Sequence, residues 1–182
     1  LDDVIIHAPY NVNLARKDKE KFDFAVRFIA TEVSGVHNIG CKYLVLHPGS
    51  AVDSERVDAL NQVANGINEI IKLTPNARTV IAIETMAGKG NEVGKTFEEI
   101  KYIIDLVEDK TRVGVCLDTC HINDGGYDLV NNYENVINEF DQVIGLEYLK
   151  VIHVNDSKNQ LSSHKDRHEN IGFGSLGFET IM

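Results

Sequence analysis

The sequence has 182 residues, of which 43% are hydrophobic and 25% charged, and its formal net charge is −10 at pH 7. This composition is typical of a globular domain with a substantial core, which excludes a disordered or fibrous chain. It also argues against a nucleic-acid partner, unless bound divalent cations reverse the charge locally. No apolar run approaches the ~18 residues of a transmembrane helix, and no basic-then-apolar leader opens the sequence. We therefore expect residues 1–182 to form one cytoplasmic domain without membrane contact.

Short apolar runs alternate with amphipathic segments along the whole chain. The predicted strands are residues 4–6, 43–46, 79–83, 113–117 and 149–152. Their nearly continuous apolar, β-branched character is typical of parallel strands buried on both faces. Apolar residues at helical spacing predict helices that include residues 22–36, 57–71, 100–107 and 133–144. Thr96 and Glu99 have the form of a capping box, which places a helix start there. The order β(αβ)4 with right-handed crossovers predicts a parallel sheet.

The three cysteines do not form a recognisable disulfide or zinc pattern. They are Cys41, Cys116 and Cys120, an odd number without a Cys-x-x-Cys pair. We interpret them as reduced, mostly buried thiols. Zinc ligation by Cys120 is the alternative interpretation.

Each predicted strand is followed by a residue of a type that binds metals. These residues are His7, His47, Glu84, Asp118 and His153, at intervals of 34 to 40 residues. One such interval holds a strand, a helix and two loops. Because active sites of parallel α/β folds gather at the carboxyl ends of the strands, we expect all five side chains on one rim. A lone histidine would more often be a solvated side chain, but five ligand-type residues in register favour a site.

Three further residues of ligand type follow in the same region, His121, Asp166 and His168. Eight candidates exceed the needs of one tetrahedral zinc and suit two or three ions of Zn²⁺ or Mn²⁺. Two cations ~3.5–4 Å apart can activate a water and stabilise the leaving oxygen of a phosphoryl displacement. Glu84 has two oxygens, and we take it as the bridging, catalytic carboxylate.

The glycine-rich residues 88–90 and 94–96 follow a strand and precede a helix, as in a phosphate-binding loop. A P-loop needs four residues between its two glycines. Here Gly88 and Gly94 enclose five residues, and Gly90 and Gly94 enclose three. We therefore predict an ordinary β/α loop and no nucleotide cofactor.

Tyr10 lies three residues after His7 and therefore on the same rim. A packed aromatic side chain is one interpretation. The other is a ring that stacks on an unpaired nucleotide.

Taken together, these motifs resemble the endonuclease IV family of zinc-dependent apurinic/apyrimidinic endonucleases. The matching blocks, in family order, are residues 7–14, 47–50, 83–90, 114–121, 153–158 and 166–168. The resemblance implies a xylose-isomerase-like TIM (β/α)8 barrel. A complete barrel takes ~250 residues, so we expect an incomplete one, about strands 3 to 7, with unpaired outer strands.

The resemblance also implies an activity and a ligand set. The family cuts the phosphodiester 5′ to abasic sites in double-stranded DNA during base-excision repair, and it removes 3′ blocking groups. By match, three zinc ions are held by His7, His47 and Glu84, by Glu84, Asp118 and His153, and by His121, Asp166 and His168. Tyr10 matches a position that inserts into bent DNA with a flipped-out nucleotide. We expect a monomer at full length.

The sequence departs from the family pattern at both ends. Two initial β/α units with a lesion-contacting arginine and a last glutamate ligand of the second zinc are not found in the 182 residues. Asn11 is polar where an apolar wedge is more usual. Two alternatives therefore stay open: a non-catalytic metal-binding fragment, and a sugar isomerase or epimerase of the xylose-isomerase-like barrels.

Overall fold

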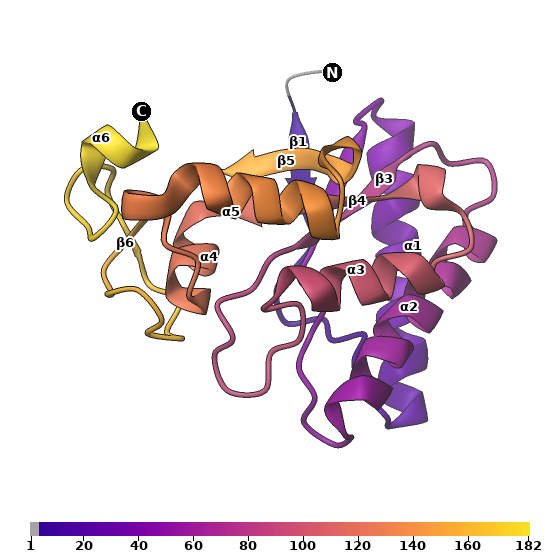
Figure 1. Cartoon of the computed structure of the whole chain (residues 1–182). Helices are drawn as coiled ribbons and strands as arrows, with labels where there is room; N and C mark the ends of the chain where they lie inside the picture. Colours follow the sequence, from indigo (N-terminus) through magenta and orange to yellow (C-terminus); the bar gives the residue numbers. More distant parts are fainter. Residues whose placement is uncertain (1–3) are drawn as a thin grey trace.

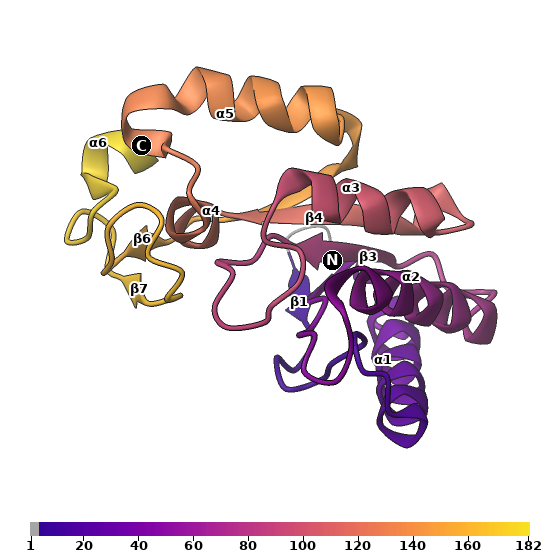
Figure 2. The same ribbon diagram turned by 60° about the horizontal axis from the view of Figure 1, so that its bottom comes forward.

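The computed structural model describes residues 4–182, in which five parallel strands form one curved sheet (Figures 1 and 2). In chain order the strands are β1 (Ile5–His7), β2 (Tyr43–Leu46), β3 (Val80–Glu84), β4 (Val113–Asp118) and β5 (Leu149–His153). The spatial order is the same as the chain order. Every neighbouring pair is parallel. All five predicted strands are thus confirmed to within a residue or two.

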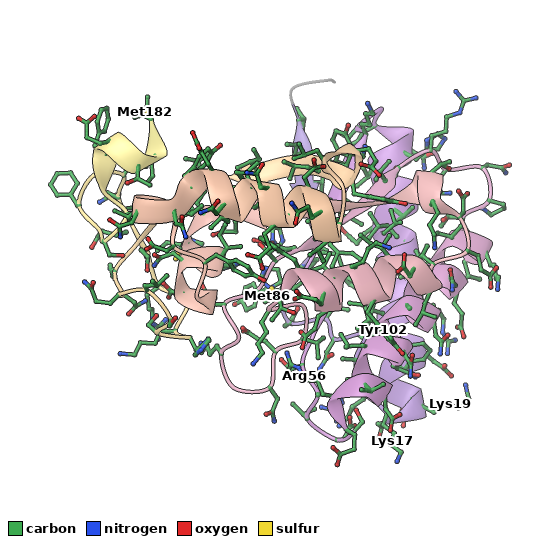
Figure 3. All side chains as sticks on the ribbon, viewed as in Figure 1. Lys17, Lys19, Arg56, Met86, Tyr102 and Met182 are labelled. Atoms are coloured by element: carbon green, nitrogen blue, oxygen red, sulfur yellow. The ribbon has the colours of Figure 1, made fainter. Side chains whose placement is uncertain are left out.

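Helices follow the strands and cover one face of the sheet. The bounds are α1 (Lys19–Asn38), α2 (Arg56–Leu73), α3 (Phe97–Leu106), α4 (Thr119–Gly125), α5 (Leu129–Val143) and α6 (Gly177–Ile181), with 3-10 turns at Lys110–Arg112 and Leu146–Tyr148. Figure 2 shows α1, α2 and α3 side by side around the sheet. Figure 3 labels Tyr102 of α3, whose hydroxyl donates to Asn61 of α2 at 2.9 Å. No helix within residues 4–182 is long and apolar enough to cross a membrane.

Capping residues explain where two of the helices begin. Asp18 accepts a hydrogen bond from Lys21 N–H at the start of α1. The predicted cap at Thr96 is confirmed, because its hydroxyl accepts from Glu99 N–H at 3.3 Å. The reciprocal half of the capping box is replaced, since the Glu99 carboxylate accepts from Gly94 and Lys95 N–H instead. Glu99 therefore also fixes the loop before α3 by hydrogen bonds.

The alternation of side chains along the strands divides the core in two. One set, including Leu44, Ile81 and Val115, packs against the helices in the main hydrophobic core. The opposite, concave face carries a small separate layer of Val45, Ala82, Cys116 and Val151. This layer forms the floor beneath the carboxyl ends of the strands.

Burial on both faces was predicted for every strand, and this is wrong for the two outer ones. All residues of β3 and β4 are buried. By contrast, Ile5 of β1 is 47% exposed and Ile152 of β5 is 53% exposed. The reason is that β1 and β5 each pair with one neighbour only, as expected for an incomplete barrel. Such edges expose unpaired backbone groups to association.

Two helices and two strands were missing from the prediction. They are α4, α6 and an antiparallel pair of two-residue strands, β6 (Asp156–Ser157) and β7 (His168–Glu169). All four lie beyond the carboxyl ends of the strands of the parallel sheet, where Figure 2 shows them together at one end of the molecule. Met182 ends the chain beside α6 (Figure 3).

Candidate metal centre

Five of the predicted ligands extend the concave face of the sheet by one layer. His47, Glu84 and Asp118 each lie two residues beyond a member of the floor layer, namely Val45, Ala82 and Cys116. The period of two along a strand therefore directs these side chains to the concave side. His7 at the end of β1 and His153 at the end of β5 complete the row. Register aligns Asp118 directly with His153.

Glu84 lies at the centre of this row with its side chain only 2% exposed. Its Oε2 is 3.0 Å from Nε2 of His7 and 3.0 Å from Nε2 of His47. Its Oε1 is 2.9 Å from Nδ1 of His153 and 3.4 Å from Nδ1 of His121. The two oxygens thus face two different groups of imidazoles, which is the arrangement a bridging carboxylate requires.

The residues around Glu84 form a first group of ligand-type residues, and a second group gathers around Asp166. Its Oδ1 is 3.1 Å from Nε2 of His121 and 3.4 Å from Nε2 of His168. Asp118 lies between the two groups, since its Oδ2 is 3.7 Å from His153 Nδ1 and 3.9 Å from His168 Nε2. The structure therefore brings all eight candidates into one continuous cluster.

Local structure explains how α4 and β7 contribute to this cluster. Asp118 ends β4 and also caps α4, accepting a hydrogen bond from His121 N–H at 2.9 Å. This single cap places a carboxylate and an imidazole on the same rim. Pairing of His168 with Ser157 in the β6–β7 ladder brings the His168 imidazole back to the site.

Buried carboxylates and imidazoles shift one another's pKa values. Burial alone would raise the pKa of Glu84, but hydrogen bonds from His153, His47 and His7 outweigh it and hold that pKa well below its usual value. The neighbouring Asp118, Cys116 and Glu84 side chains raise the pKa of His153 to about 12. Protonated imidazoles thus supply the positive charge that these buried anions require.

Burial lowers the pKa of His121, but the hydrogen bond with Asp166 and the charges of Asp118 and Glu84 raise it to about 9. The same hydrogen bond lowers the pKa of Asp166. The second group therefore has the same electrostatic character as the first, with anions that hold positive charge close to them.

The donor chemistry fits divalent metal ions. His7 directs Nε2 toward Glu84 while its Nδ1 bonds the carbonyl of Ala8. His121 directs Nε2 toward Asp166 while its Nδ1 bonds the carbonyl of Thr85. Such bonds on the remote ring nitrogen are usual for metal-binding histidines, because they fix the tautomer and the ring plane.

Three sets of residues each have donor atoms that lie within 4.8 Å of one another, which is close enough for the members of a set to share an ion. The sets are His7, His47 and Glu84; Glu84, Cys116 and His153; and Asp118, His121 and His168. Asp118 thus falls into one set with His121 and His168. The resemblance to the family instead assigns Asp118 to the ion held by His153. Among the residues described, Cys120 belongs to none of these sets.

A cavity of about 540 Å³ opens above the cluster. Tyr10 lines its rim and is 82% exposed, so the interpretation of this ring as a packed aromatic is wrong. Lys89 and Glu92 from the glycine-rich loop also line the cavity and were missed. Their position in the loop after β3, on the active rim, was the signal available in the sequence.

The family model described as "Xylose isomerase-like TIM barrel" matches residues 3–182. The chain belongs to this family. The five-stranded parallel sheet is therefore part of a TIM barrel of the xylose-isomerase-like type, present in incomplete form.

Curated relatives in this family carry the name "Probable endonuclease 4". The relative from Acholeplasma laidlawii is 52% identical over 182 residues, which is 100% of this chain and 62% of the relative. The relative from Pediococcus pentosaceus is 52% identical over 180 residues, 98% of this chain and 60% of the relative. The chain thus spans about three fifths of their length. The resemblance to the endonuclease IV family is confirmed.

Solved structures agree with the barrel fold. Endonuclease IV from Thermus thermophilus superposes with a TM-score of 0.85 at 33% identity, covering 97% of this chain and 61% of that one. A D-tagatose 3-epimerase-like protein superposes with a TM-score of 0.78 at 21% identity, covering 97% of this chain and 63% of that one. The second likeness shows the shared fold only.

Proposed function

We propose that the chain carries the metal centre of a hydrolase of the endonuclease IV type, which cuts the phosphodiester 5′ to abasic sites in double-stranded DNA. Removal of 3′ blocking groups would be a second activity of the same site. One observation carries the proposal: seven histidine and aspartate side chains form one cluster with Glu84 in a chain 52% identical to relatives named as endonuclease 4. A repair role would place the protein in the cytoplasm, and we propose that it is a monomer at full length.

Three zinc ions would occupy the cluster, with Mn²⁺ as the other candidate ion. His7, His47 and Glu84 would hold the first, Glu84, Asp118 and His153 the second, and His121, Asp166 and His168 the third. The distance of 3.0 Å from Glu84 Oε2 to both His7 and His47 supports the first assignment. The position of Asp118 between the two groups suits a ligand shared between neighbouring ions.

The chain's own residues would hold and orient the reacting groups. When bound, the ions would polarise the phosphodiester, lower the pKa of a bound water and stabilise the leaving oxygen. Glu84, buried and acceptor-only, keeps both oxygens directed at the cluster. Tyr10 presents an exposed ring at the rim, where it would stack on the nucleotide next to the lesion.

The ions would also change the electrostatics of DNA binding. Three Zn²⁺ ions add six positive charges at the cavity, whereas the chain alone has a formal net charge of −10. Phosphates would therefore meet a locally positive surface on an acidic protein.

Metal analysis combined with an incision assay tests the proposal. We expect about three zinc ions per chain after equilibration with excess zinc, and metal-dependent cleavage of a duplex with one abasic site, leaving a 3′-hydroxyl. One ion or fewer without incision would overturn the proposal. Zinc binding without incision would favour the non-catalytic fragment, and turnover of a keto sugar would favour the isomerase or epimerase.

A further inference from the structure

The loop that carries Asp166 and His168 has an unusual backbone. Ser162, His164 and Asp166 have φ angles of 63°, 53° and 54°, and none of them is a glycine. This left-handed region is unfavourable for residues with a side chain, so such conformations persist only where the surrounding structure fixes them. Every second residue from Ser162 to Asp166 has this left-handed backbone, which requires a specific restraint.

Asp124 near the end of α4 supplies a restraint of this kind. The residue is completely buried, and its carboxylate accepts four hydrogen bonds. Oδ1 accepts from Ser157 Oγ at 2.6 Å and from Asn123 Nδ2 at 3.2 Å. Oδ2 accepts from Asn159 Nδ2 and from the backbone N–H of Asp166, both at 3.0 Å. Every lone pair thus faces a donor.

Each of the three left-handed residues donates its backbone N–H to one of two adjacent residues of α4, Asn123 or Asp124. Ser162 N–H donates to the carbonyl of Asn123 at 3.1 Å, and His164 N–H donates to the carbonyl of Asp124 at 3.0 Å. Asp166 N–H donates to the Asp124 carboxylate. The positions of these three N–H groups match the acceptors at the end of α4 one to one.

Asp124 connects directly to the metal cluster through this contact. The residue whose N–H it holds, Asp166, places its carboxylate 3.1 Å from His121 and 3.4 Å from His168. His121 lies three residues before Asp124 on α4, so one short helix carries both an imidazole and the restraint. No other carboxylate among residues 4–182 is seen to bond this N–H.

We propose that Asp124 is a positioning residue for the third metal: it holds Asp166 in the left-handed conformation that directs the Asp166 carboxylate at His121 and His168. This inference rests on the proposed function. Asp124 itself does not line the cavity above the cluster. Its effect is therefore exerted through Asp166 and not through contact with a metal or with substrate.

The first test compares zinc titrations of the wild type, Asp124→Ala and Asp124→Asn against a chelator of known affinity. We expect Asp124→Ala to weaken one of the three zinc equivalents by about 10- to 100-fold, as for other residues that orient metal ligands, and to leave the other two unchanged. Asp124→Asn should restore most of the affinity, because its carbonyl oxygen can still accept from Asp166 N–H while its NH2, which loses the bond from Asn123 Nδ2, donates to the Ser157 hydroxyl oxygen. Equal weakening of all three equivalents, or of none, would overturn the inference.

Glu99→Ala provides the matched control. Like Asp124, Glu99 is a carboxylate that accepts backbone hydrogen bonds from a neighbouring loop, at Gly94 and Lys95. That loop carries none of the eight proposed ligands. We expect a loss of thermal stability in Glu99→Ala with all three zinc affinities retained. Selective loss of one zinc in this control would count against a specific role for Asp124.

The second test needs neither a variant nor a metal. In the metal-free wild type, the amide hydrogen of Asp166 should exchange slowly with solvent, as measured by NMR, because Asp124 accepts it. Exchange as fast as that of an unstructured amide would overturn the inference. This result is independent of the proposed function, which fails instead if the wild type binds one zinc ion or fewer and does not incise an abasic duplex.

Discussion

Glu84→Gln is the substitution that should affect the cluster most. The wild-type carboxylate contacts His7 and His47 at 3.0 Å through one oxygen and His153 at 2.9 Å through the other. Two unit charges 3.0 Å apart interact by about 5 kcal/mol at an effective dielectric constant of about 20. A cation bound in place of the imidazole protons would feel at least this attraction, which we reduce to about 3 kcal/mol because the site is partly exposed; its loss corresponds to roughly a 100-fold loss of zinc affinity.

Glu84 belongs to the first two proposed sites and not to the third. The zinc content of Glu84→Gln should therefore fall from about three ions per chain to about one, as measured by metal analysis after dialysis against buffered zinc. Glu98→Gln is the control, because it makes the same change of charge at an exposed position in the first turn of α3. Three zinc ions bound to Glu84→Gln with unchanged affinity would refute the bridging role.

Three further predictions concern Tyr10, Phe97 and the cysteines. Tyr10→Ala should leave the free energy of unfolding within about 0.5 kcal/mol, because the ring is exposed. It should weaken binding of an abasic duplex by about 1–3 kcal/mol in a fluorescence anisotropy titration, and unchanged binding would exclude stacking. Phe97→Ala should destabilise the fold by about 3–5 kcal/mol in urea unfolding, because the ring is fully buried; a loss below about 1 kcal/mol would contradict the assigned packing. Burial raises the pKa of Cys116 to about 11 and of Cys120 to about 12 and shields both thiols, so in the native protein at pH 7 they should react with a thiol reagent far more slowly than in denaturant. Labelling that is rapid before denaturant is added would contradict that prediction, which extends to buried Cys41.

Periodicity was sufficient to predict the strands, the long helices and the rim on which the site lies. It located His47, Glu84 and Asp118 at strand ends, because a strand buried on both faces leaves an uninterrupted apolar run up to its first polar residue. The cluster itself was predictable for the same reason. Side chains that follow consecutive parallel strands must meet at one edge of the sheet.

The remaining features depend on contacts between distant residues. Helix α4 has only seven residues, and β6 and β7 have two each, so none is long enough to show a period. The role of Asp124 could not be predicted from the sequence, since its hydrogen-bond partners Ser157 and Asp166 lie 33 and 42 positions away. The exposure of β1 and β5 depends on which neighbours a strand has, and residue composition carries no information about that.

The distribution of ligands across the sheet has a consequence for stability. Glu84 and Asp118 come from the inner strands β3 and β4 and are 2% and 0% exposed, whereas His7 and His153 on the outer strands are 38% and 27% exposed. Buried anions destabilise a fold unless cations lie against them, while a partly exposed imidazole costs little whether it is neutral or protonated. The centre of the sheet therefore requires positive charge more than its edges do.

Metal removal tests this consequence. A ligand that binds only the folded state stabilises it by about 2.7 kcal/mol when its free concentration is 100 times its Kd. Addition of a chelator to the zinc-loaded wild type should therefore lower Tm by several degrees in thermal unfolding followed by circular dichroism. The decrease should be much smaller in Glu84→Gln, because that variant holds about one ion in place of three. An equal decrease in both proteins would mean that zinc stabilises the fold elsewhere, and that the buried carboxylate of Glu84 obtains its positive charge from the surrounding imidazoles alone.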